Sequence, residues 1–393
     1  MARGADKTRL GYLDDHLKRE INRGAFPGVT TNIWREGRLI HENALGQRDI
    51  ERGAPMTSDS LCRLYSMSKP ITSVALMQLY ERGLVRLDQP VADFIPAWKD
   101  LQVRDPADRR ANIACARPMS VQHLLSHQSG LGTAHAARPA LGDHPARPAP
   151  RTLDETVARL AQAPLSFHPG DEFDYGVSTD IVGYLVQVIS GERFDRYLQR
   201  WIFEPLGMTD TAFNARDPAR LAALYEKRPD GLKLIDDPAA SRLLGDITYH
   251  SGSGGLVGTA IDYQRFGRML LGHGELDGQR ILGRKTLELM TLNHLTGGRT
   301  ISAATRQPFF KPFTGQGFGL GFGIMLDPAE AGLSGSIGEF NWTGAAGSLC
   351  FVDPAEDLMV VFMTQSMPPL PPPDPANPYG WRELRALIYG ALA

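Results

Sequence analysis

The sequence predicts an α/β (α+β) fold in which both ends of the chain contribute strands to one antiparallel sheet. Residues 29–47 read as two strands joined at Arg35-Glu36-Gly37, where glycine marks a hairpin turn. Residues 347–351 and 358–364 read as a second hairpin around a polar turn. Segments with helical periodicity lie between the two hairpins, so we expect helices to form an insert and to flank the sheet.

The helices follow from the spacing of apolar residues. Leu10, Leu13, Leu17 and Ile21 share one face of a helix expected over residues 10–23. Ile71, Val74, Ala75 and Leu79 repeat with the same period in a helix that Gly83 ends. Shorter or later helices are expected at 91–94, at 120–125 with Ser120 as cap, at 153–162, at 179–189 with Gly191 as its end, and at 381–392.

Two further segments complete the predicted organisation. Residues 317–326 alternate glycine with large apolar residues, which predicts a strand packed closely against another element. Residues 132–151 are rich in alanine, proline and histidine without periodicity, which predicts a long flexible surface loop or flap. We therefore expect a sheet lobe from residues 1–100 and 246–393 and a mainly helical lobe from residues 101–245.

Composition excludes several classes of protein. The chain of 393 residues has 42 Lys and Arg against 44 Asp and Glu, so we expect neither nucleic acid nor an anionic membrane as a partner. Cys62, Cys115 and Cys350 lack the C-x-x-C spacing of a zinc site and do not suggest a disulfide framework. The N-terminus lacks the apolar stretch of a secretory signal, and no apolar run approaches the ~18 residues of a membrane span. These features predict a cytoplasmic protein, with a periplasmic one left open if a signal was removed, and leave its oligomeric state open.

The candidate reactive group is Ser66, in the sequence S-M-S-K that ends at Lys69. Residues three apart share a helix face, so the lysine can activate the serine without a histidine. Pro70 fits only the first helical turn, which places Ser66 at or just before the helix N-terminus, where unpaired N–H groups favour an oxyanion. A simple role for Ser66 as the helix N-cap fits the same four residues and stays open.

Two later motifs give the chain a recognisable pattern. Residues 173–178 (FDYGVS) place a tyrosine just before a helix, and residues 341–345 (NWTGA) precede a strand. Together with the S-x-x-K motif and the phrases at 124–131 and 254–260, they occur in the order found in serine β-lactamases. The chain thus resembles the serine β-lactamase-like superfamily, and within it family VIII carboxylesterases and class C β-lactamases, from about residue 28 to 365. The resemblance implies a β-lactamase/transpeptidase-like fold with an antiparallel sheet flanked by helices and an all-helical lobe.

The resemblance also implies roles for individual residues. Ser66 would be the acylated nucleophile, Lys69 would hold or remove its proton, and Tyr175 would be the partner base that protonates the leaving group. Which of Lys69 and Tyr175 is the acylation base stays open. The oxyanion hole would be the backbone N–H groups of Ser66 and Ala345, and no metal or cofactor is implied. The remaining substrate-binding positions would be Trp342, Thr343, Gly344 and Val177. Taken alone, Tyr175 and Trp342 also fit ordinary half-buried or core aromatic residues.

Two departures from the β-lactamase pattern bear on the substrate. Trp342 stands where these enzymes carry a lysine that attracts a substrate carboxylate, and an indole cannot replace that charge. Val177 stands where they carry an asparagine that binds the substrate amide. Both changes favour a serine hydrolase acting on small-molecule, short-chain carboxylic esters through an acyl-enzyme. A β-lactamase, a D-amino-acid amidase, an acyltransferase and a non-catalytic ligand-binding protein remain as alternatives.

Other catalytic motifs are weaker. No G-x-S-x-G occurs, which argues against the nucleophile turn of an α/β-hydrolase. His123 and His127 are four apart but lack the glutamate of H-E-x-x-H, so we expect a structural pair and not a zinc site. The glycine-rich residues 251–255 are interpreted as a tight turn.

Overall fold

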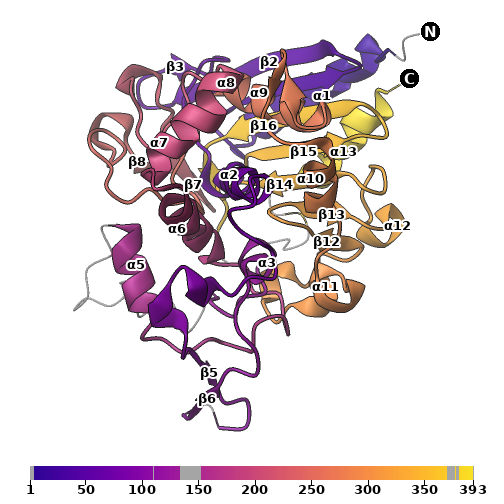
Figure 1. Cartoon of the computed structure of the whole chain (residues 1–393). Helices are drawn as coiled ribbons and strands as arrows, with labels where there is room; N and C mark the ends of the chain where they lie inside the picture. The colour runs from indigo at the N-terminus through magenta and orange to yellow at the C-terminus, as the bar shows by residue number, and fades with distance from the viewer. Residues whose placement is uncertain (1–3, 109, 133–151, 370–376, 378–379, 393) are drawn as a thin grey trace.

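A sheet of eight antiparallel strands, in the order β12-β13-β14-β15-β16-β1-β2-β3, occupies the upper half of the molecule as seen in Figure 1. The structure, a computed structural model, describes residues 4–108, 110–132, 152–369, 377 and 380–392. Strands from both ends of the chain meet where β1 pairs with β16, with Val29 opposite Thr364. The predicted antiparallel sheet is thereby confirmed. Its strands are β1 (Gly28–Arg35), β2 (Arg38–Asp49), β3 (Ala54–Pro55), β12 (Gln316–Phe318), β13 (Gly323–Met325), β14 (Phe340–Thr343), β15 (Leu349–Asp353) and β16 (Leu358–Thr364).

Both predicted hairpins form. The turn between β1 and β2 falls at Glu36 and Gly37, which have φ of 46° and 71°, and β15 pairs with β16 as expected. The prediction of one strand over residues 317–326 is wrong, because β12 and β13 are two short strands that pair with each other. Gly321, with φ of 98°, reverses the chain between them, and a Cβ there would lie 2.2 Å from Ser73 Oγ. The turn therefore packs directly against the helix that carries Ser73.

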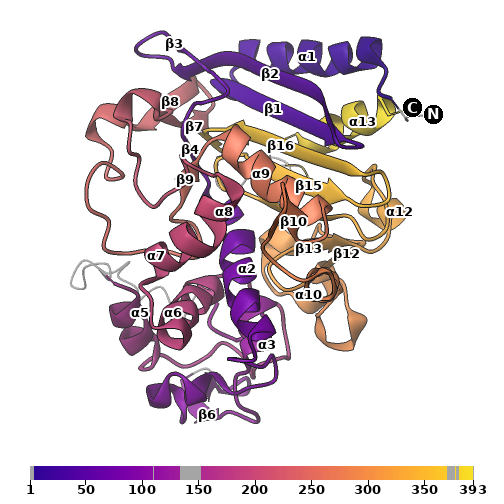
Figure 2. The same cartoon turned by 45° about the horizontal axis from the view of Figure 1, so that its top comes forward.

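Helices cover both faces of the sheet (Figure 2). α1 (Lys7–Asn22), close to the predicted 10–23, and α13 (Trp381–Gly390) lie on one face, where Leu10, Leu13 and Leu17 join a core with residues of β1, β15 and β16. α9 (Ala260–Leu271) covers the other face. The described termini lie close together, since Ala5 forms a bridge with Leu392.

The central helix is α2 (Ser68–Glu81), which follows the S-x-x-K motif (Figure 1). The predicted helix is confirmed, but its buried residues are not limited to the expected apolar stripe. Ser68, Thr72 and Ser73 are as buried as the leucines, because α6 (Ser178–Ser190) and the β12–β13 turn pack on the helix as well. Gly191 ends α6 in a left-handed conformation, as predicted.

The remaining elements are short. Ser120 caps α3 (Val121–Leu125) as expected, and the helices predicted near 91–94, 153–162 and 381–392 are present. The predicted loop at 132–151 lies, except for Gly132, outside the described residues, and the two-lobe boundaries stay a prediction. The other α-helices are α5 (Leu153–Leu160), α7 (Phe194–Leu198), α8 (Glu204–Leu206), α10 (Arg284–Met290), α11 (Ile301–Ala304) and α12 (Pro328–Ala331). Four small sheets complete the structure. They pair β4 (Cys62–Arg63) with β9 (Val257–Gly258), β5 (Gln102–Arg104) with β6 (Asn112–Ala114), β10 (Glu275–Leu276) with β11 (Gln279–Arg280), and β7 (Leu224–Arg228) with both β8 (Gly231–Asp236) and β17 (Ser366–Met367).

Two negative findings hold for the described part of the chain. None of its helices combines the length and the apolar character needed to cross a membrane. Cys62, Cys115 and Cys350 are all unpaired.

Candidate active site

Ser66 lies in a single 3-10 turn, Tyr65–Met67, between β4 and α2. Tyr65, just before it, has φ of 46°, a strained conformation for a bulky residue that is found mostly at functional sites. Ser66 itself is half-buried and remains reachable. The residue at the N-cap position of α2 is Met67, and no side chain caps the helix, so the simple capping role for Ser66 is not observed.

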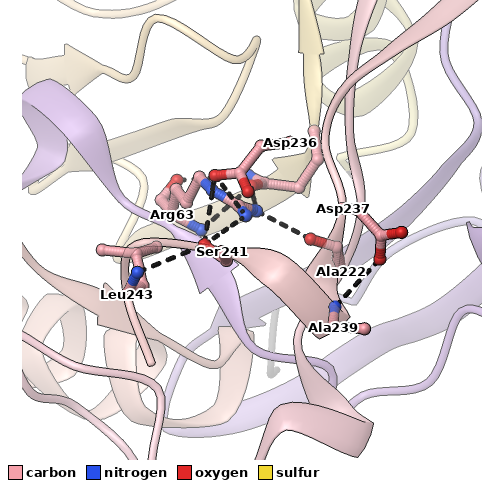
Figure 3. A network of polar contacts seen from close by, with 8 residues as sticks. Arg63, Ala222, Asp236, Asp237, Ala239, Ser241 and Leu243 are labelled. Carbon is pink, nitrogen blue, oxygen red and sulfur yellow. Dashed lines mark hydrogen bonds and ion pairs between the residues drawn. The ribbon is translucent and has the colours of Figure 1, made fainter. Parts of the chain in front are cut away.

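A buried arginine anchors the segment that leads to Ser66 (Figure 3). The Arg63 guanidinium lies 2.8 Å from the Asp236 carboxylate and donates to the carbonyl oxygen of Ala222 at 2.7 Å. The side chain of Gln365 exchanges two hydrogen bonds with the Arg63 backbone, at 3.0 Å to its N–H and 3.1 Å to its C=O. Three separate segments therefore hold the backbone three residues before the serine.

Lys69 makes the contact that the S-x-x-K spacing predicts. Its Nζ lies 3.0 Å from Ser66 Oγ and donates to the carbonyl oxygen of Ser253 at 2.7 Å. The same ammonium lies 4.5 Å from the centre of the Tyr175 ring. The side chain is only 3% exposed, so these contacts replace its hydration.

The Ser253 carbonyl belongs to the glycine-rich turn at 251–255. The turn forms as expected, with Gly255 N–H donating to Ser251 O at 2.9 Å. The Asp180 carboxylate fixes it by accepting from Ser253 N–H at 2.9 Å and from Ser251 Oγ at 2.7 Å. Sequence reasoning missed this link to Lys69, because a backbone carbonyl leaves no mark on the sequence. Asp180, the single acid in the apolar α6, is the one signal that could have drawn attention to it.

Tyr175 lies half-buried just before α6, with its hydroxyl beside Trp342. The indole Nε1–H donates to Tyr175 Oη at 3.0 Å, and the two rings are 5.2 Å apart. Trp342 is 6% exposed and belongs to an aromatic core with Phe173 and Phe318, so it is both a core residue and a direct partner of the tyrosine. A donor at Oη stabilises negative charge on that oxygen.

His127 also packs against Tyr175. The ring centres are 4.6 Å apart, and His127 Nδ1 accepts a hydrogen bond from Gly176 N–H at 3.4 Å. Burial, together with the positive charge of Lys69, holds the pKa of His127 well below its usual range, so the ring is neutral. His123 instead accepts from Ser120 N–H at the start of α3. Within the described residues, no group of three or more His, Cys, Asp or Glu side chains could hold a metal ion.

The third motif approaches Ser66 at the end of β14. A Cβ on Gly344 would lie 2.6 Å from the carbonyl oxygen of Leu64, so only glycine allows this approach. Thr343 and Ala345 on either side are half-buried, and the Ala345 N–H thus lies in a segment that packs beside the serine. Val177 flanks the start of α6 and packs against the core, and its contact with substrate stays a prediction.

Asp174, the residue before Tyr175, provides a test of local electrostatics. Burial, with repulsion from Glu172, raises the pKa of its carboxyl from the usual 3.8 to about 6. The native state therefore favours the protonated acid, and this contribution to stability is lost as pH rises from 3.8 through 6. We expect Asp174→Asn to raise the free energy of unfolding by up to about 3 kcal/mol at pH 7.5, and by about half of that at pH 5. Urea unfolding at both pH values measures the difference, and an equal gain at both would contradict the assignment.

Comparisons with known proteins identify the family and support the fold. The sequence model of the Beta-lactamase family matches residues 13–384. Protein Rv1367c of Mycobacterium tuberculosis (strain ATCC 25618 / H37Rv) is 33% identical over 363 residues, which is 90% of this chain and 89% of that protein. Esterase EstB of Burkholderia gladioli is 30% identical over 380 residues, 91% of this chain and 90% of EstB. Among solved structures, a similar one is EstCE1, described as a hydrolase with promiscuous acyltransferase activity. It has a TM-score of 0.82 at 26% identity, and the match covers 98% of this chain and 99% of the EstCE1 chain. The chain therefore belongs to the Beta-lactamase family, and it is an enzyme of the β-lactamase-fold group of hydrolases and acyltransferases.

Proposed function

We propose that the protein is a carboxylesterase, a serine hydrolase that cleaves short-chain carboxylic esters through an acyl-enzyme. The observation that carries the proposal is the 3.0 Å contact between Lys69 Nζ and Ser66 Oγ, with the ring of Tyr175 beside the same ammonium. EstB, named an esterase, supports it at 30% identity. A non-catalytic binding protein would not need this serine, lysine and tyrosine together.

In the proposed reaction, Ser66 Oγ attacks the ester carbonyl and its proton passes to the Lys69–Tyr175 pair. The backbone N–H groups of Ser66 and Ala345 would hold the oxyanion that forms. The pair then delivers the proton to the oxygen of the leaving alcohol as the ester C–O bond breaks. Water, activated by the same pair, attacks the acyl-enzyme and releases the carboxylic acid and free Ser66.

The preference for neutral esters rests on Trp342. β-Lactams and peptide substrates carry a carboxylate, and this position offers an almost buried indole whose N–H already bonds Tyr175. A charge-assisted hydrogen bond to the substrate is therefore missing. Val177 has no polar group for a substrate amide. Transfer to an alcohol acceptor in place of water is the second candidate, favoured by the description of EstCE1.

A substrate panel tests the proposal. We expect p-nitrophenyl acetate and butyrate to be hydrolysed with a much larger kcat/KM than nitrocefin or benzylpenicillin. Longer acyl esters and an added alcohol acceptor in the same assay measure chain-length preference and acyl transfer. Turnover of nitrocefin as efficient as that of p-nitrophenyl butyrate would replace the esterase assignment by a β-lactamase.

The Trp342→Lys variant tests the cause of this preference. A cation at this position supplies one charge-assisted hydrogen bond worth about 1.5–3 kcal/mol. We therefore expect the ratio of ester to lactam kcat/KM to narrow by roughly ten- to a hundredfold. Trp342→Phe, which removes the indole N–H without adding charge, is the matched control and should slow both reactions without narrowing the ratio. Equal ratios in the two variants would show that the missing charge does not set the preference.

A further inference from the structure

A glutamine far from the sequence motifs holds the backbone of Tyr175. Gln307 Oε1 accepts a hydrogen bond from Tyr175 N–H at 3.0 Å, and Gln307 Nε2 donates to the Tyr175 carbonyl oxygen at 2.9 Å. The two residues are 132 positions apart. Tyr175 lies outside any helix or strand, so regular secondary structure does not fix it.

The pairing continues a short ladder between the same two segments. Phe173 forms a parallel bridge with Thr305, and its N–H donates to Ala304 O at 2.9 Å. Two residues further along each segment, the primary amide of Gln307 takes the place of a peptide group, because it offers one acceptor and one donor side by side. The Phe310 ring packs 5.2 Å from the Tyr175 ring and supports it from the same segment.

The molecule uses the same device beside its serine. The Gln365 side chain pairs with both backbone groups of Arg63, three residues before Ser66. Two glutamines thus hold, in the same way, the segments that deliver Ser66 and Tyr175. Each pair joins segments that are far apart in the sequence.

The orientation of the Gln307 amide is itself fixed. Its side chain also shares a hydrogen bond with the carboxyl of Asp174. Because the Tyr175 carbonyl can only accept and the Tyr175 N–H can only donate, the amide nitrogen faces the carbonyl and the amide oxygen faces the N–H. Both donor and acceptor functions of the side chain are therefore in use.

We propose that Gln307 is a positioning residue for catalysis, which holds Tyr175 at the distance from Lys69 and Trp342 that proton transfer requires. The inference rests on the proposed function, since it assumes that Tyr175 moves the proton. A misplacement of about 1 Å in a catalytic group can lower the rate by about a hundredfold. Gln307 itself does not touch the reacting atoms in this proposal.

The test uses two substitutions of Gln307 in the full-length protein with p-nitrophenyl butyrate as substrate. Gln307→Leu keeps the bulk but removes both hydrogen bonds, and we expect kcat to fall by roughly ten- to a hundredfold with little change in KM. Gln307→Glu retains the acceptor, but it recovers the donor only when its carboxyl is protonated. The neighbouring Asp174 and Glu172 favour that protonated form. Around Glu172, Asp171 acts in the same direction, whereas Arg306, Arg299 and Lys311 oppose it. The ratio of variant to wild-type kcat should therefore rise by about tenfold as pH falls from 8 to 5, reversibly in one sample.

Gln187→Glu is the matched control. Gln187 Oε1 accepts from Phe194 N–H, and its amide nitrogen donates to no group among the described residues. A carboxylate can make the same contact at every pH, so the ratio of Gln187→Glu to wild-type kcat should stay flat. If the ratio of Gln307→Glu to wild-type kcat does not change between pH 8 and pH 5, the inference is overturned, even if Gln307→Leu fails to fold. This holds because the recovery of kcat at low pH is measured on one folded sample of Gln307→Glu. Tyr175→Phe separates the two proposals. If it stays active, the proposed role of Tyr175 falls, whereas an inactive Tyr175→Phe beside a normal Gln307→Leu refutes only the positioning role.

Discussion

Ser66→Ala is expected to abolish ester turnover and acylation by a phosphonate probe. Its Oγ lies 3.0 Å from Lys69 Nζ, on a half-buried turn that directly follows the strained Tyr65. Removing a nucleophile of this kind lowers kcat by several orders of magnitude, to about 10⁻⁶ of the original value in a comparable serine enzyme. Steady-state hydrolysis of p-nitrophenyl butyrate and intact-mass analysis after the probe measure both effects.

Ser73→Ala is the matched control for that variant. Ser73 lies on α2, the helix that follows the Ser66 turn, is 1% exposed and packs against the Gly321 turn, so its loss should leave turnover and labelling intact. The serine that carries the probe can be identified by peptide mass spectrometry of the wild-type protein. An adduct on Ser68, Ser129 or Ser253 in place of Ser66 would overturn the assignment of the nucleophile.

Features that depend on neighbouring residues could be predicted from the sequence. Glycine at 37 places the first hairpin turn, and apolar spacing places α1, α2 and α6. The contact between Ser66 and Lys69 follows from one helical turn, so the S-x-x-K spacing was sufficient to predict it. The β-lactamase-like fold was indicated by the order of several short motifs, none of which would identify it alone.

Features that depend on distant contacts could not be predicted. The Gly321 turn splits a segment that reads as one strand, because the packing of that turn on Ser73 is invisible in the local pattern. The partner of Lys69 is a backbone carbonyl at Ser253, which any residue could supply. Gln307 lies in no motif, and its pairing with Tyr175 appears only when the two segments meet. The sequence shows only that Trp342 lacks the positive charge of the lysine it replaces. The structure shows in addition that its indole N–H donates a hydrogen bond to Tyr175 Oη.

Lys69 and Tyr175 are expected to share the path of the Ser66 proton. Lys69→Ala removes the donor to Ser66 Oγ and to the Ser253 carbonyl, while Tyr175→Phe removes only the hydroxyl that faces the Trp342 indole. Each should lower kcat by about 10²- to 10⁴-fold with the fold intact, since general acid–base groups contribute that much.

Because the ammonium lies 4.5 Å from the centre of the tyrosine ring, the two groups are expected to act as one unit. The double variant should then lose far less than the product of the two single losses, and the coupling energy from the four kcat values measures this directly. Tyr225→Phe is the matched control, since that hydroxyl bonds Glu51 and the backbone of Ile50 and should not affect kcat. Additive losses would mean that the lysine and the tyrosine act in separate steps, and a single variant with near-normal kcat would mean that another residue takes the proton from Ser66.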